Sequence, residues 1–138
     1  MQIEIRSAVD QNAAEKLIHD LAELVQVNQA AIDRVIITDR YGETISDVLG
    51  QPGTQTHTEN EQVVGVGKTI PKRSETGETV STVVLPTTTL QEAFAYLDPG
   101  FQGNRAMAGQ YYYAIAHEIG HGKDHFTRNG KESSALAL

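Results

Sequence analysis

Cysteine is absent from this chain of 138 residues. Its absence excludes disulfide bonds, thiolate zinc sites and a cysteine nucleophile. The redox compartment stays open, because a protein without cysteine works in oxidising and reducing surroundings alike. Any chemistry in this chain must therefore come from other side chains.

Basic residues are scarce as well. Eleven Lys and Arg stand against eighteen Asp and Glu, which gives a formal net charge of -7. A surface that binds nucleic acid needs a basic patch to neutralise phosphates, so we expect no nucleic acid partner. The same balance gives no support for docking on anionic membranes.

Long apolar runs are also missing. No stretch approaches the roughly 20 apolar residues that a membrane-spanning helix needs, so we expect no membrane partner. The opening residues 1–6 lack the apolar core of a signal peptide. We therefore expect a protein that is cytoplasmic or exported without a cleaved signal, or a domain taken from a longer chain.

The periodicity of the first half predicts a β-α-β order. Ile3 and Ile5 alternate with polar residues, which indicates a strand through about residue 8. Asn12 and Glu15 have the spacing of a capping box, and apolar residues follow at helical spacing from 14 to 25. A β-branched run at 34–38 predicts the next strand, and 39–42 has turn composition.

The second half predicts a hairpin followed by helices. A polar loop at 50–62, which contains His57, precedes two β-rich runs at 63–70 and 79–85. Thr89 and Glu92 form a second capping box for a helix through Leu97, and another helix should run from about 106 to Gly122. We therefore expect a single domain over 1–138 of class α+β, with a small, mixed, twisted sheet backed by helices.

The most specific pattern lies in that last helix, where His-Glu-x-x-His occupies 117–121. On a helix the two histidines lie one turn apart on the same face, so both imidazoles can reach one ion. Zinc suits such a pair. Glu118 is placed to contact a metal-bound water without binding the metal itself. The pattern predicts His117 and His121 as metal ligands and Glu118 as the catalytic residue.

This segment resembles the active-site helix of the zincin metallopeptidases. The resemblance is specific over 114–122 and extends to the rest of the chain only in the order of its elements. It implies a zincin-like fold with a C-terminal active-site helix, a bound Zn²⁺ and a protein or peptide substrate. It also implies a sheet edge, supplied by the hairpin at 63–85, along which an extended peptide aligns.

A zincin needs a third protein ligand. The metzincin pattern would place a glycine at Asp124 and a histidine at Thr127, so that pattern fails. On an unbroken helix His125 would lie about 12 Å beyond His117 along the axis, so it could bind only if the chain turned sharply at Gly122.

Glu132 opens a second short helix after the turn expected at 129–130. That arrangement is similar to the gluzincins and to the metallopeptidase domains of bacterial polymorphic (Rhs-type) toxins and secreted effectors. The resemblance ranks Glu132 first as third ligand, His125 second and Asp124 third. It also implies a cognate inhibitor or immunity protein as a partner.

The expected function is zinc-dependent hydrolysis of peptide bonds, with Glu118 as general base and then general acid. The tyrosines at 111–113 precede the motif, but such a run usually serves packing, so no oxyanion-stabilising role is assigned to them. Two alternatives stay open: a non-catalytic zinc-binding module, and a metal-free interaction domain in which the motif is coincidental.

Overall fold

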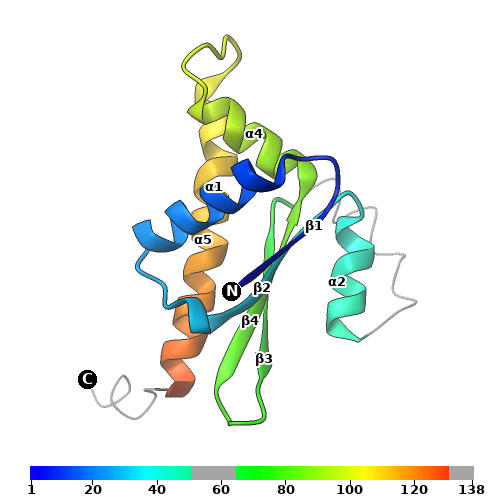
Figure 1. Cartoon of the computed structure of the whole chain (residues 1–138), viewed down its shortest axis with the longest axis vertical. Coiled ribbons are helices and arrows are strands. Elements are labelled where there is room, and N and C mark those ends of the chain that lie inside the picture. Colours follow the sequence, from blue (N-terminus) through cyan, green and yellow to red (C-terminus); the bar gives the residue numbers. More distant parts are fainter. Residues whose placement is uncertain (51–64, 131–138) are drawn as a thin grey trace.

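The computed structural model describes residues 1–50 and 65–130, with side chains through 126 (Figure 1). Its strands are β1 (Gln2–Arg6), β2 (Ile32–Thr38), β3 (Lys68–Arg73) and β4 (Thr79–Pro86). Its helices are α1 (Gln11–Leu24), α2 (Tyr41–Leu49), α4 (Thr87–Leu97) and α5 (Arg105–Gly130), with a short 3-10 turn, η1 (Gln29–Ala31), before β2. The expected α+β class is confirmed.

The four described strands form one mixed sheet in the order β1-β2-β4-β3. β1, β2 and β4 are parallel, whereas β3 runs antiparallel to β4. The predicted hairpin is therefore present, with β4 inside the sheet and β3 at its edge. Its second strand covers 79–86, but the first begins at Lys68, and the predicted residues 63 and 64 lie outside the described residues.

Helices cover both faces of the sheet, and the alternation of strand side chains builds a core on each. Val83 and Leu85 of β4 face α1, α4 and α5, while Val84 between them faces α2. Figure 1 shows α2 separated from the other three helices by the strands. The larger core, on the α5 side, includes Ile115 and Ile119, neither of which is exposed to solvent.

The start of α1 differs from the predicted capping box. The cap is Asp10, whose Oδ2 accepts a hydrogen bond of 2.8 Å from the backbone N–H of Ala13. Asn12 therefore lies inside the first turn rather than before it. The predicted apolar stripe is buried at Ala14, Leu17, Ile18 and Leu21, but Leu24 at the helix end is 63% exposed.

The predicted turn at 39–42 is wrong, because Tyr41 and Gly42 open α2. Tyr41 and Ile45 lie one helical turn apart and pack on Ile70 and Val84. This burial against the second face of the sheet stabilises a helix over a segment whose composition is typical of a turn.

The capping box predicted for α4 is also wrong. The helix begins at Thr87 after Pro86 and has no side-chain cap. The Thr89 hydroxyl, expected to cap the helix, donates instead to the carbonyl oxygen of Val66 at 2.9 Å. It therefore ties α4 to the segment that enters β3.

The end of α5 is the largest departure from expectation. Asn104 opens the helix by accepting a hydrogen bond of 3.1 Å from the N–H of Met107, close to the predicted start. The helix does not stop near Gly122 but runs to Gly130. Gly122 serves packing, because a Cβ there would lie 2.7 Å from Cδ1 of Ile32 and 3.7 Å from Cβ of Ser81. Its missing side chain lets α5 lie close to β2 and β4.

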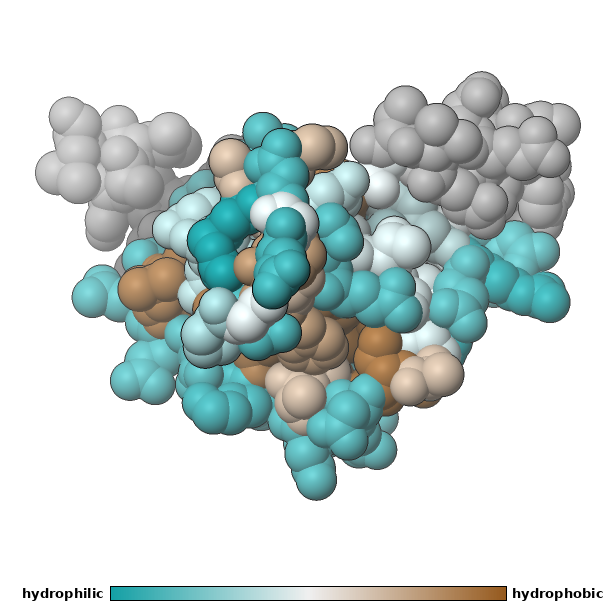
Figure 2. All heavy atoms as spheres, turned by 90° about the horizontal axis from the view of Figure 1, so that it is seen from above, coloured by the Kyte–Doolittle hydropathy of each residue, from teal (hydrophilic) through white to brown (hydrophobic). Residues whose placement is uncertain are grey.

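The surface seen from above is mainly hydrophilic, with apolar side chains showing between the polar ones (Figure 2). The exposed large apolar side chains among the described residues are Leu24, Leu49, Leu97, Met107 and Tyr113. In the part of the chain that the structure describes, every helix is too short or too polar to cross a membrane.

Two glycines of α5 give a matched test of this packing. Gly122→Ala should destabilise the protein by about 1–2 kcal/mol, because overpacking against Ile32 outweighs the gain in helix propensity. Gly120→Ala, with nothing within 4 Å of its added Cβ, should stabilise the protein by about 0.5–1 kcal/mol. Urea unfolding followed by circular dichroism measures both. A more stable G122A would contradict the packing role.

Candidate metal and hydrolytic site

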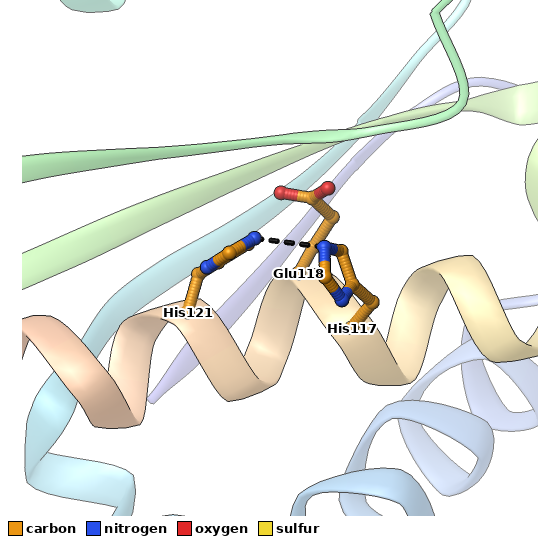
Figure 3. Close-up of side chains that lie close together, drawn as sticks. All are labelled: His117, Glu118 and His121. Atoms are coloured by element: carbon orange, nitrogen blue, oxygen red, sulfur yellow. Dashed lines mark hydrogen bonds between the residues drawn. The ribbon is translucent and has the colours of Figure 1, made fainter.

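Three polar side chains leave α5 on the side that faces β3 and solvent (Figure 3). Ile115 and Ile119 fix the rotation of the helix by pointing into the core. With about 100° between successive residues, His117, Glu118 and His121 must then emerge at the flank of that buried stripe. His117 is exposed, whereas Glu118 and His121 are half-buried.

The two histidines point at one place. Their Nε2 atoms are 2.8 Å apart, at hydrogen-bond distance, and their ring centroids are 4.2 Å apart. Tetrahedral zinc, with Zn–N distances of about 2.0–2.1 Å, would hold two such nitrogens about 3.4 Å apart. A small increase in the distance between the two Nε2 atoms would therefore admit an ion. The hydrogen shared between them would be lost, because each nitrogen must offer a lone pair to the metal.

Glu118 completes the group. One of its carboxylate oxygens and one nitrogen from each histidine all lie within 4.8 Å of one another. Among the residues that the structure describes, no other set of three His, Asp or Glu side chains has this geometry. The donor set fits a metal ion of the kind that imidazole prefers.

The sheet holds Glu118 from the other side. Thr69 of β3 lies opposite Val83 in the hairpin register and therefore faces α5. Its Oγ1 lies 2.8 Å from Oε1 of Glu118 and 2.6 Å from the backbone carbonyl oxygen of the same residue. The edge strand thus contacts both the side chain and the main chain of the predicted catalytic residue.

Gly67, just before β3, provides the space for this contact. A Cβ at that position would lie 3.1 Å from Cγ of Glu118 and 2.9 Å from Cδ2 of Leu85. A larger residue would push Glu118 away from the strand. The adjacent Val66 carbonyl accepts the hydrogen bond from Thr89, so this segment is held from α4 as well.

The candidates for a third ligand separate clearly. A sharp turn at Gly122, the condition for His125 to bind, is contradicted by a helix that continues to Gly130. The His125 ring centroid lies 6.5 Å from that of His121. Neither His125 nor Asp124 belongs to the converging group. Glu132, like the loop residue His57, lies outside the described residues.

Three tyrosines from α4 and α5 cluster on the N-terminal side of the motif. Tyr96, Tyr112 and Tyr113 have ring centroids 5.1 to 6.0 Å apart, and Tyr112 packs against the larger core. Tyr113 is 58% exposed. Its hydrogen bond with Tyr96 raises the pKa of its phenol above the ordinary value.

The sequence pattern did not reveal Thr69 or Gly67. Each is separated from Glu118 by about fifty positions, and a threonine in a strand or a glycine before one is ordinary on its own. The sequence indicates only that the hairpin before the motif helix should lie beside the site, and it does not indicate which hairpin residue contacts Glu118. Only the register of β3 decides which of its residues faces α5.

Removal of either histidine should strongly weaken metal binding. Loss of a residue that only supports a metal ligand lowers affinity about 10- to 100-fold. His117→Ala and His121→Ala each remove a ligand itself, so each should weaken Zn²⁺ affinity by more than that. His19→Ala, on α1, serves as the control. Competition with a chromophoric chelator measures the affinities. Equal affinity in H117A and the unsubstituted protein would exclude the pair as ligands.

Comparison with known proteins adds no relative. No family model, curated protein or solved structure matches this chain. The assignment of the site therefore depends on its own residues and geometry.

Proposed function

We propose that this protein is a zinc-dependent metallopeptidase. The observation that carries the proposal is the convergence of His117 Nε2 and His121 Nε2, 2.8 Å apart, beside a glutamate that the edge strand contacts. A chance match to the sequence pattern on a surface helix would not require the intervening glutamate to be held by a neighbouring strand. The reaction class is hydrolysis of a peptide bond.

His117 and His121 would hold the zinc ion through their Nε2 atoms. When bound, zinc would supply Lewis acid chemistry, polarising a carbonyl and lowering the pKa of water toward neutrality. The half-buried positions of Glu118 and His121 favour such chemistry, because reduced contact with bulk water strengthens electrostatic interactions.

Glu118 would move the proton. Its carboxylate accepts a proton from the attacking water as the water oxygen bonds to the carbonyl carbon. The same carboxyl then delivers that proton to the amide nitrogen as the C–N bond breaks. A carboxylic acid, which keeps the second hydrogen of the water, and an amine result, and Glu118 returns to its starting state.

The position of β3 supports a peptide substrate. In the described sheet β3 is an edge strand, and its Thr69 touches Glu118. An extended peptide added at that edge would lie about 4.8 Å from β3, beside the three converging side chains. Pro71 has no N–H to offer an added strand, so pairing there must depend on its neighbours.

Glu132 is the proposed third ligand. The resemblance ranks it first, while α5 continues through Gly122 without the turn that His125 would need. The turn predicted at 129–130 is also wrong, because α5 includes both residues, so Glu132 reaches the histidine pair only if the chain reverses after Gly130. The same resemblance to the metallopeptidase domains of polymorphic toxins and secreted effectors extends the proposal. A toxin or effector protease would act on a protein substrate and be held by a cognate inhibitor or immunity protein.

Glu118→Ala should abolish peptide hydrolysis and leave zinc bound. Loss of a general base costs about 10²- to 10⁴-fold in rate, whereas the two histidine ligands are untouched. A fluorogenic peptide or casein assay, run with chelator and after zinc is restored, measures activity, and metal analysis measures zinc. Glu23→Ala, an exposed carboxylate on α1, is the matched control.

A non-catalytic zinc-binding module gives a different result in the same experiment. It would hold about one zinc per chain and hydrolyse no substrate in the unsubstituted protein. Full activity in E118A would refute the proposed mechanism, and absence of zinc from the purified protein would refute the metal site.

The third ligand has its own test. Glu132→Gln should weaken zinc affinity by at least about 100-fold, because a neutral amide replaces a charged ligand. His125→Gln and Asp124→Asn should leave the affinity nearly unchanged. Chelator competition on the three variants decides among them. Weakening confined to H125Q would mean that α5 bends on metal binding.

A further inference from the structure

The hydroxyl of Thr69 makes an unusual pair of contacts. Its two acceptors among the described residues, Oε1 at 2.8 Å and the backbone carbonyl oxygen at 2.6 Å, both belong to Glu118. A threonine hydroxyl carries one hydrogen, so it donates to one of these oxygens at a time. Whichever oxygen accepts, β3 remains tied to Glu118.

A free glutamate side chain on a helix surface would sample several rotamers. Fixing such a side chain costs conformational entropy, and a hydrogen bond to a charged oxygen is among the contacts strong enough to offset it. Gly67 flanks the same side chain, because Cγ of Glu118 lies 3.1 Å from the position that a Cβ would take at Gly67. The strand and the residue before it therefore restrict where the carboxylate can lie.

We propose that Thr69 is a positioning residue for Glu118. By donating to Oε1, its hydroxyl holds the carboxylate on the β3 side of the histidine pair, where the same strand would align a peptide. The inference deepens the proposed hydrolytic function and rests on it. Among the described residues the Thr69 hydroxyl bonds to Glu118 and to neither histidine, so its effect should fall on the proton-transfer step rather than on metal binding.

The hydroxyl can be removed without changing the shape of the residue. Thr69→Val keeps the β-branch, which suits a strand, and Thr69→Ser keeps the hydroxyl. In T69V we expect kcat to fall about 10- to 100-fold with KM within about twofold, because a misplaced catalytic group loses rate rather than ground-state binding. T69S should recover most of the lost rate.

A matched control lies one strand away. Thr82 of β4 pairs with Ile70, the residue after Thr69, and therefore faces the opposite side of the sheet. Thr82→Val makes the same chemical change without approaching Glu118, and its activity should match that of the unsubstituted protein. Circular dichroism and thermal unfolding confirm that each variant is folded.

Two measurements separate positioning from a general structural effect. Zinc affinity from chelator competition should be the same in T69V and the unsubstituted protein. In a Glu118→Ala background, T69V should change the residual rate by less than about twofold, since the carboxylate that Thr69 positions is already absent.

A third measurement does not depend on activity. In the metal-free protein, the two Hγ resonances of Glu118, assigned by their loss in E118A, should be distinct when the side chain is held. They should stay distinct in T69S and approach one another in T69V. This readout stands even if the protein hydrolyses no peptide, so failure of the proposed function and failure of the positioning role are distinguishable.

Three results would overturn the inference. One is a T69V protein with unchanged kcat and unchanged Glu118 resonances. Another is a T69S variant as impaired as T69V, which would mean that the methyl group matters and the hydroxyl does not. The third is a loss of rate in T69V that is equally large with and without Glu118.

Discussion

The close approach of α5 to the sheet is the constraint on which the site depends. Gly122 allows it, since a Cβ at that position would lie 2.7 Å from Ile32 Cδ1. Ile115 and Ile119 hold the helix in the same core as Val83 and Leu85 of β4. Because the helix cannot rotate or move outward without opening this core, Glu118 is held within reach of Thr69 on the neighbouring strand.

The site joins two kinds of structure. The histidine pair is local: the two residues are four positions apart on one helix, and this spacing brings their imidazoles together wherever the helix is placed. The support of Glu118 is non-local, because Thr69 and Gly67 come from the chain that enters the edge strand. A hydrolytic site needs both parts: the local pair to bind an ion, and a rigid neighbour to hold the base and align a substrate.

Net charge describes this site poorly. The chain carries -7 overall, yet three of the six residues of β3 are basic, namely Lys68, Lys72 and Arg73. Surface charges are screened beyond about 8–10 Å at physiological salt, so the electrostatic potential at the edge strand is set mostly by these nearby groups. Basic side chains and a proline are also what edge strands use to discourage unwanted pairing. Under the proposed function, these residues would favour a transient peptide over a permanent neighbour.

Local chemistry determined the strands, the hairpin, the amphipathic α1 and the His-Glu-x-x-His group, because each is visible as a short-range pattern of hydrophobicity or spacing. Tertiary contacts decided what that pattern could not. Tyr41 is helical because its side chain packs against the second face of the sheet. Gly122 lies inside α5 and packs against Ile32 instead of ending the helix. The register of β3 places Thr69 on the side of the sheet that faces Glu118. In each case the deciding partner lies far away in sequence, where no local propensity records it.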